Sequence, residues 1–478
     1  IGLDLMMHFF SCLLVCASLV CVATAERLPN IIYILTDDLG YGDLSCNGQT
    51  FFQTPHIDRL AAEGMKFTQH YSGSTVCAPS RCSLMTGKHT GHTVVRGNSE
   101  VKPEGQQPMP ADTFTMAHML QQAGYTTGLF GKWGLGAPGS QSEPLLMGFD
   151  RFYGYNCQRH AHHYYPYFIW DDHQREMLWG NFGMETEEYA PTLIQAEVMK
   201  FIESNQDRPF FCYYAVIQPH AEMFAPEEYM EKYRGKFLPE SSYEGTDDGP
   251  DFRKYAYGSQ PEGHAAFAAM VHTIDDYVGE ITARLKELGI DDNTLIIFTS
   301  DNGPHQEAGH DPAYFNSNGS MRGFKRDLYE GGINVPMIAR WPGKVAAGTE
   351  TDLISAFWDV MPTVAEMAKV DAPTDIDGIS FLPTLLNRDG QKQHDYLYWE
   401  FHEKKGRVAI RKGNWKGVRY NVSIDAHSPL ELYDLSADPQ EQYNIAMQHP
   451  DVVAELDLLM KNARTESPVK RYNFPSRR

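Results

Sequence analysis

Buried strands alternate with amphipathic helices along most of the chain. Unbroken apolar runs predict strands at 28–35, 125–130, 210–217, 294–298 and 335–340. Apolar positions at helical spacing predict helices at 54–64, 112–123 and 265–288, the first two with Thr54 and Asp112 as N-caps. This alternation predicts an α/β fold with a large mixed, mostly parallel sheet sandwiched by helices.

The pattern changes near residue 388. Short alternating aromatic segments, divided by Gly, Asn and Asp, stand at 396–399, 407–410, 415–418 and 430–433. Such segments are typical of a small antiparallel sheet, and a closing helix is expected at 450–461. We therefore expect a large domain over 26–387 and a smaller C-terminal domain of antiparallel sheet plus helix over 388–478.

The first 25 residues form a third kind of segment. Their apolar run is short for a membrane span and closes on Ala23-Thr24-Ala25. It predicts a signal peptide cut after Ala25, a secreted or periplasmic protein, and no stable membrane insertion. After cleavage, and apart from Cys77, four cysteines remain that permit one or two disulfides without fixing a pairing: Cys46, Cys82, Cys157 and Cys212.

The net charge of the chain limits the kinds of molecule that it can bind. The 478 residues carry a formal net charge of −21, which argues against nucleic acid as a partner. The long-range field of the protein also repels an anionic substrate. Such a substrate would have to be held by a local cluster of metal, lysine and arginine.

Polar side chains stand where the predicted strands end: Asp37, Asp38, Lys132, His220, Asp301 and Asn302. Sheets of this kind bind ligands at the carboxyl ends of their strands. The Asp37-Asp38 and Asp301-Asn302 pairs supply only oxygen ligands, which suit a hard cation such as calcium rather than zinc. Either pair alone is also common in turns, whereas two such pairs together favour a metal site.

The segment Cys77-Ala78-Pro79-Ser80-Arg81 is the other chemical signal. Pro79 suits the first turn of a helix. Residue 77 would then lie at the positive end of that helix, where an anion is stabilised. For these five residues alone, a buried cysteine before a proline-initiated helix is the alternative.

Taken together, the motifs resemble those of the type I sulfatases, the formylglycine-dependent enzymes of the alkaline phosphatase superfamily. The likeness includes Cys-x-Pro-x-Arg at 77–81, the two acidic motifs at 36–43 and 299–304, Gly131-Lys132-Trp133, and the segments 322–332 and 432–439, in the family's order. It implies an alkaline phosphatase-like fold, a sulfuric ester hydrolase, and a maturation enzyme that oxidises Cys77 to formylglycine. The hydrated aldehyde offers two hydroxyls, of which one attacks sulfur and the other later expels sulfate.

Carried over residue by residue, the resemblance implies roles for individual side chains. One calcium ion would be held by Asp37, Asp38, Asp301, Asn302 and the converted Cys77. Arg81 would hold the formylglycine hydroxyl. Lys132 and Lys325 would grip sulfate oxygens. His220 would protonate the leaving alcohol.

One position departs from the family pattern. The family usually has Lys-Trp-His where this chain has Lys132-Trp133-Gly134. The missing imidazole is the one generally assigned to take a proton from the covalent sulfate intermediate. Either the loss impairs turnover or another residue fills the space, and the sequence leaves five candidates open: His160, His162, His163, His305 and His310.

The 157–170 segment is dense in aromatic residues and histidines. Such a stretch can line a core, but it better fits a loop that faces a sugar, with rings on pyranose faces and imidazoles on hydroxyls. Substrate-binding candidates are therefore Arg159, His160, His162 and His163, with His305 and His310 on the other side.

The leading expectation is an exo-acting sulfatase for a sulfated saccharide, such as a sulfated galactan, carrageenan or glycosaminoglycan-type oligosaccharide. A phosphatase or phosphonate hydrolase of the same superfamily is the nearest rival. A weakened carbohydrate-binding paralogue is a further alternative, and Gly134 is its only sign in the sequence.

Overall fold

The computed structural model describes residues 27–249, 252–254 and 256–475. The predicted signal peptide lies outside the described residues. No helix in the described ranges is both long enough and apolar enough to span a membrane.

A ten-stranded sheet forms the centre of the large domain, in the order β11-β2-β10-β9-β1-β8-β4-β5-β6-β7. Its strands are β1 (Asn30–Thr36), β2 (Met65–Phe67), β4 (Thr126–Lys132), β5 (Arg151–Tyr155), β6 (Phe168–Asp171), β7 (Gln174–Met177), β8 (Phe210–Ala215), β9 (Thr294–Ser300), β10 (Met337–Arg340) and β11 (Thr349–Thr351). Strands β9, β1, β8, β4 and β5 are parallel, whereas β10 and the β6–β7 hairpin run antiparallel to their neighbours. The predicted mixed, mostly parallel sheet is confirmed.

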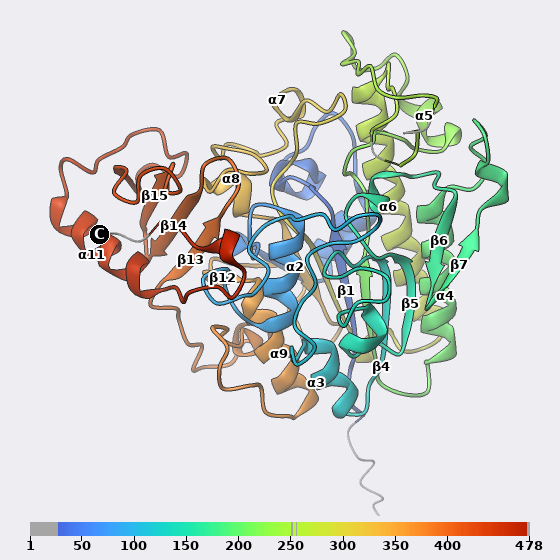
Figure 1. Ribbon diagram of the computed structural model, residues 1–478. Helices are drawn as coiled ribbons and strands as arrows, with labels where there is room; N and C mark the ends of the chain where they lie inside the picture. The colour runs from blue at the N-terminus through green and yellow to red at the C-terminus, as the bar shows by residue number, and fades with distance from the viewer. Residues whose placement is uncertain (1–26, 250–251, 255, 476–478) are drawn as a thin grey trace, which may run out of the picture.

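Helices cover both faces of this sheet (Figure 1). The helices of the large domain are α1 (Pro55–Ala62), α2 (Cys77–Thr86), α3 (Met116–Gln122), α4 (Ala190–Ser204), α5 (Glu227–Tyr233), α6 (Gly263–Glu287), α7 (Pro312–Phe315), α8 (Glu330–Ile333), α9 (Val360–Ala368) and α10 (Leu382–Leu385). On β1, Ile32 and Ile34 pack in the core with α1, α4 and α6. Ile31, Tyr33 and Leu35 pack on the opposite face with α2, α3 and α9. Because β1 is buried on both faces, its sequence is a continuous apolar run.

The C-terminal part, orange to red in Figure 1, is a separate four-stranded antiparallel sheet. It contains β13 (Leu397–Phe401), β14 (Arg407–Lys412), β15 (Trp415–Tyr420) and β16 (Leu430–Asp434), with helix α11 (Pro450–Asn462) against one face. The other face buries Trp399 and Tyr433 against Leu328 and Trp358 of the large domain. A short parallel pair, β3 (His70–Tyr71) and β12 (Ser355–Ala356), lies beside this contact.

The prediction that Asp112 is the N-cap of helix α3 is wrong. Helix α3 begins at Met116, and Thr115 is its cap, accepting a hydrogen bond from the His118 N–H at 3.2 Å. Asp112 lies exposed in the preceding turn. Both residue types favour N-caps, and Thr115 wins because it directly precedes the first buried position of the helix.

No disulfide forms among the described cysteines. Cys46, Cys82, Cys157 and Cys212 are all free thiols. The one or two disulfides that their number permitted are therefore not made.

Candidate active site at the strand ends

Helix α2 places Cys77 beside the end of β1. The helix starts at Cys77, as Pro79 predicted, and the side chain is 1% exposed. Its Sγ lies 3.4 Å from Asp37 Oδ1. Residue 77 is therefore held between a helix N-terminus and a carboxylate.

The two acidic pairs meet because β1 and β9 are neighbouring parallel strands. Thr36 is paired with Ser300, so Asp37 and Asp301 follow at the same level. The Asp38 N–H donates to Asp301 Oδ1 at 3.2 Å. Residues distant in sequence thus form one oxygen-rich cluster, as predicted.

Arg81 ties this cluster to helix α2. Its guanidinium donates to Asp37 at 3.1 Å and to Asp301 at 2.9 Å, and also to the Lys132 carbonyl at 2.6 Å. All of these side chains are almost completely buried. A charged fork with several acceptors is rigid, so Arg81 fixes α2 relative to the strand ends.

Two lysines add further positive charge. Lys132 ends β4, and its Nζ lies 2.5 Å from Asp37 Oδ2. Lys325, in the loop before α8, places its Nζ 2.7 Å from Asp38 Oδ2. The local cationic cluster that an anionic substrate needs is therefore present in this acidic chain.

His220 lies on the turn after β8 with its Nε2 turned toward the cluster. Its Nδ1 donates to the Ala221 carbonyl, so Nε2 carries the lone pair and accepts from Lys325 Nζ at 2.9 Å. The Tyr164 hydroxyl donates to the His220 carbonyl at 2.7 Å and holds this turn. Burial, and then Lys325, keep the pKa of His220 well below its usual range.

The strand-end oxygens fit a hard cation. Asn302 donates through Nδ2 to Asp38 at 2.6 Å, while its buried Oδ1 has no partner among the described residues. Burial, and then Asp37, raise the pKa of Asp301. Burial also opposes ionisation of Asp37, but the nearby cations outweigh it and lower its pKa. An additional positive charge would allow both carboxylates to ionise, and their oxygens suit calcium. A nitrogen of His220 and the sulfur of Cys77 lie within 4.8 Å of oxygens of Asp37 and Asp38.

The space beside Gly134 is occupied by Gln158, a residue that the sequence did not single out. The φ of Gly134 is 76°, and a Cβ built on Gly134 would lie 2.1 Å from Gln158 Nε2. The Gln158 carboxamide therefore occupies the space where a side chain at position 134 would begin. Gln158 is buried and its Oε1 has no partner among the described residues. Nothing in the sequence pattern pointed to Gln158.

Among the five candidate histidines, His162 lies against His220. Their rings stack with centroids 4.8 Å apart and an interplanar angle of 15°, and His162 also contacts the ring of Tyr257 at 5.2 Å. The backbone carbonyl of His162 accepts from the Glu222 N–H at 3.2 Å, which anchors the turn. His162 therefore belongs to the wall of the candidate active site.

His305 lies beside the strand-end cluster: its ring stacks on His220 with centroids 5.7 Å apart, and a ring nitrogen lies within 4.8 Å of Asp38 and Glu307 oxygens. His305 donates through Nε2 to the Pro219 carbonyl at 3.0 Å and accepts through Nδ1 from the Glu307 N–H at 3.1 Å, so both ring nitrogens are occupied. His310 is buried and stacks on Phe267 with centroids 3.8 Å apart. Both rings are buried, and the substrate role of both histidines stays a prediction.

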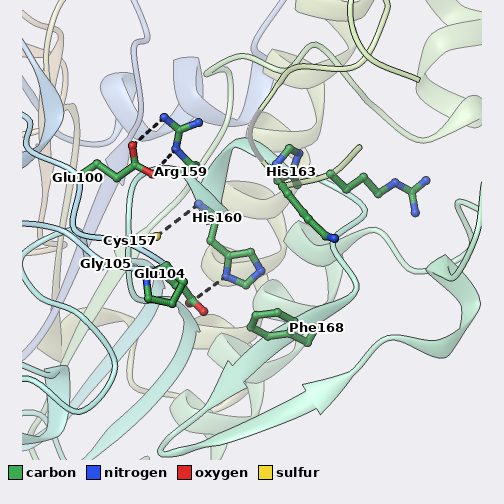
Figure 2. A pocket seen from close by; sticks show the side chains of 11 residues that line it. Glu100, Glu104, Gly105, Cys157, Arg159, His160, His163 and Phe168 are labelled. Carbon is green, nitrogen blue, oxygen red and sulfur yellow. Dashed lines mark hydrogen bonds and ion pairs between the residues drawn. The ribbon is translucent and has the colours of Figure 1, made fainter. Parts of the chain in front are cut away.

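The other members of the 157–170 group line a separate cavity of about 120 Å³ (Figure 2). Arg159 pairs with Glu100 at 2.7 Å, and His160 Nδ1 lies 3.5 Å from Glu104. His163 lines the same cavity and lies 3.5 Å from Glu222. The predicted histidines are thus divided: His162 and His305 stack on His220, whereas His160 and His163 line this other cavity.

Two further side chains lie beside Lys325 that the sequence did not assign. Glu307 Oε2 is 3.3 Å from Lys325 Nζ, and Glu307 Oε1 is 2.7 Å from Arg326. Both Glu307 and Arg326 are partly exposed. Their positions next to Lys325 in space make them part of the rim of the site. For Arg326 the available signals were its place next to Lys325 and within the segment 322–332 that resembles the family.

A helix that presents residue 77 to strand-end carboxylates and paired lysines, on a sheet of this topology, defines a hydrolase of the alkaline phosphatase type. The chain belongs to the sulfatase family, whose profile matches residues 29–370. The profile described as "N-sulphoglucosamine sulphohydrolase, C-terminal" matches residues 321–466. By family, this chain is therefore a sulfuric ester hydrolase, as the motifs implied.

Individual relatives cover most of the chain. It is 30% identical to an N-acetylgalactosamine-6-O-sulfatase of Bacteroides thetaiotaomicron, over 92% of this chain and 94% of the relative. It is 31% identical to human arylsulfatase A, over 91% and 87% respectively. The crystal structure of Ps i-CgsB in complex with k-i-k-neocarrahexaose superimposes with a TM-score of 0.75 at 26% identity, covering 91% of this chain and 92% of that one.

Proposed function

We propose that this sulfatase removes sulfate from the end of a sulfated carbohydrate chain, using formylglycine formed from Cys77 and one calcium ion. The observation that carries the proposal is the place of Cys77, which lies at the start of α2 with Sγ 3.4 Å from Asp37. Relatives named for N-acetylgalactosamine sulfate and a structure holding a carrageenan-type oligosaccharide support the choice of carbohydrate.

Calcium would be held by Asp37, Asp38, Asp301 and Asn302 together with residue 77. When bound, it supplies Lewis-acid polarisation of a sulfate oxygen and of the attacking hydroxyl. Formylglycine, as the hydrated aldehyde, supplies that hydroxyl. Arg81, fixed by two carboxylates, would orient residue 77.

Lys132 and Lys325 would bind the sulfate oxygens. Their ammonium groups neutralise charge that grows on the sulfate in the transition state. His220 would donate a proton to the leaving alcohol from Nε2. Its Nδ1 bond to Ala221 fixes the ring, and Lys325 lies 2.9 Å from Nε2 as a neighbouring proton source.

His162 would serve as the base in place of the imidazole that is missing at position 134. It stacks on His220, whereas both ring nitrogens of His305 are occupied and Arg159, His160 and His163 line another cavity. Gln158 fills the volume above Gly134. This wall of the site is therefore closed by other residues, which supports an active enzyme over a weakened paralogue.

The test combines mass spectrometry with a substrate panel. The protein is produced with a formylglycine-generating enzyme, and the peptide bearing residue 77 is analysed for conversion. Sulfate release is then measured on sulfated galactans, glycosaminoglycans, fucans and an aryl sulfate, and phosphate release on a phosphate monoester and a phosphonate monoester. We expect conversion and sulfate release from a saccharide.

Cys82→Ala is a matched control for Cys77→Ala, because both cysteines are buried in helix α2. Only Cys77→Ala should abolish turnover. An unmodified thiol at residue 77 in fully active enzyme would overturn the formylglycine proposal. Release of phosphate with no release of sulfate would favour the rival hydrolase.

A further inference from the structure

Three exposed side chains, Trp179, Phe182 and Met184, and the partly buried Tyr167 form what we call the aromatic patch. Trp179 is 71% exposed and Met184 60% exposed. The rings of Trp179 and Phe182 stack with centroids 4.9 Å apart, and Tyr167 extends the stack at 5.2 Å from Phe182. Contiguous exposed apolar side chains of this kind mark binding surfaces.

The aromatic patch is held in place by buried hydrogen bonds. Asn181, which is fully buried, donates through Nδ2 to the Pro166 carbonyl at 2.9 Å and the Glu188 carbonyl at 2.8 Å. The Leu178 N–H donates to the Tyr167 carbonyl at 3.0 Å. The patch is thereby fastened to the segment that follows the His160–His162 turn. A binding surface that is already ordered loses little entropy when a ligand binds.

A cavity of about 280 Å³ is lined by Met184 of the aromatic patch and by Glu222, whose N–H donates to the His162 carbonyl at 3.2 Å. Met184, two residues beyond Phe182, lines one part of it, and Glu222, two residues beyond His220, lines another. Glu222 also lies 3.5 Å from His163, which lines the cavity in Figure 2. Arg253 lines both cavities. The cavity is therefore lined both by a residue of the aromatic patch and by a residue that is hydrogen-bonded to the wall of the candidate active site.

The chemistry of this surface suits a saccharide chain. Flat aromatic faces pack against the apolar C–H faces of pyranose rings, and a few polar groups then fix orientation. The Arg253 guanidinium lies 5.7 Å from the Tyr167 ring centroid and donates to the Glu185 carbonyl at 2.8 Å. It supplies a positive charge beside the rings, where an anionic sugar would need one.

We propose that the aromatic patch and the 280 Å³ cavity bind the sugar units that follow the sulfated terminal unit. This inference rests on the proposed function, because it takes the substrate to be a sulfated carbohydrate. It deepens that function by assigning chain length: the enzyme favours an oligosaccharide over a short fragment that fills the catalytic site alone.

Trp179→Ala and Phe182→Ala test the inference, with Tyr443→Ala as a matched control at a similarly exposed ring in the C-terminal part. Sulfate release is measured on hexasaccharides and disaccharides prepared from 6-sulfated chondroitin and from carrageenan. For the wild type we expect a higher kcat/KM on the hexasaccharide. In Trp179→Ala this advantage should fall at least about fivefold through KM, as expected for the loss of one stacking contact. Tyr443→Ala should retain it.

An unchanged hexasaccharide advantage in both patch variants would overturn the inference. So would a dimer that dissociates in Trp179→Ala while oligosaccharide kinetics stay the same, because the patch would then bind a second copy of the chain. If the wild type cleaves only the aryl sulfate, the proposed carbohydrate function fails, and the patch is tested by calorimetric titration with the same hexasaccharides. Binding that is lost in Trp179→Ala would support the patch, and absence of binding would overturn it.

Discussion

Two clusters of buried charge differ in whether their hydrogen bonds are complete. At the centre of one, in the C-terminal part, Glu400 accepts from Arg96 and Arg464 at 2.7 Å, His402 at 2.9 Å and Tyr398 at 3.0 Å. We call this set the Glu400 cluster. In the strand-end cluster of the candidate active site, Asn302 Oδ1 has no partner among the described residues.

The pKa shifts follow the same division. Burial opposes ionisation of Glu400, but His402 and Arg96 outweigh it and lower the pKa of Glu400. In the strand-end cluster, burial and Asp37 raise the pKa of Asp301. A charge whose partners are all in the chain stabilises the fold, whereas a cluster that leaves an oxygen unpaired and holds a carboxyl that is hard to ionise is arranged for a ligand.

The largest expected effect is in the strand-end cluster. Asp301→Asn removes one negative charge from the proposed calcium site and one acceptor from Arg81. We expect sulfate release from an aryl sulfate to fall by about 10³-fold. The melting temperature should change little or rise, because a buried carboxyl that is hard to ionise has been removed.

Asp112→Asn is the control, since Asp112 is exposed and outside the cluster. Calorimetry and sulfate release are measured on the same preparations. If Asp301→Asn kept turnover within tenfold of the wild type, Asp301 would not be part of a metal site that organises the reaction.

The second effect is in the Glu400 cluster, where we expect a loss of stability with little change in turnover. Glu400→Gln leaves Arg96 and Arg464 without a buried countercharge, which costs about 3–5 kcal/mol of stability. Turnover per folded molecule should stay within about twofold, because Glu400 touches none of the proposed catalytic groups. Urea unfolding and active-site titration would measure the two quantities separately.

A Glu400→Gln protein that unfolded at the wild-type urea concentration but lost turnover would contradict the structural role of Glu400. The Glu400 cluster would then have a functional role. Retained turnover with a lower unfolding midpoint would support the division between a structural cluster and a functional one.

The third effect concerns His162. If this imidazole is the base, His162→Ala should slow aryl sulfate turnover by about 10²-fold, the usual contribution of a positioned base. Added imidazole should restore part of the rate, which loss of a purely structural ring would not allow. His173→Ala, at an exposed histidine of the same region, is the control. If His162→Ala kept the wild-type turnover, His162 would not be the base.

The strand-end site could be predicted because it follows from strand order. The apolar runs at β1 and β9 mark buried strands, and polar residues after adjacent parallel strands must meet at one edge. The same reasoning gave the place of Cys77, since Pro79 fixes the first turn of α2.

Side-chain direction within short turns could not be predicted in this way. His160, His162 and His163 lie in or next to one 3₁₀ turn, with three residues per turn, so neighbours in sequence point to different sides. Gln158 reaches the space above Gly134 only because β4 and the segment after β5 pack together. That contact is tertiary and leaves no periodic signal.

The smallest expected effect concerns Asp43, a buried carboxyl that belongs to neither cluster. Its Oδ2 accepts from the Gly40 N–H at 2.7 Å, and its Oδ1 has no partner among the described residues. Burial raises the pKa of Asp43 from 3.8 to about 7. The folded state therefore holds this proton more tightly than the unfolded state, so the contribution of Asp43 to stability falls as pH rises from about 4 to about 7.

Asp43→Asn should remove this pH dependence. The amide keeps an oxygen for the Gly40 N–H and carries no charge to desolvate, so the variant should gain about 2–3 kcal/mol on the wild type between pH 5 and pH 8. The difference is read from urea midpoints at both pH values, with Asp112→Asn as the exposed control. Parallel pH profiles for Asp43→Asn and the wild type would contradict the prediction. Asp43 would then ionise without cost although no cation faces it, and a carboxyl pKa raised by burial could no longer distinguish the strand-end cluster from the rest of the fold.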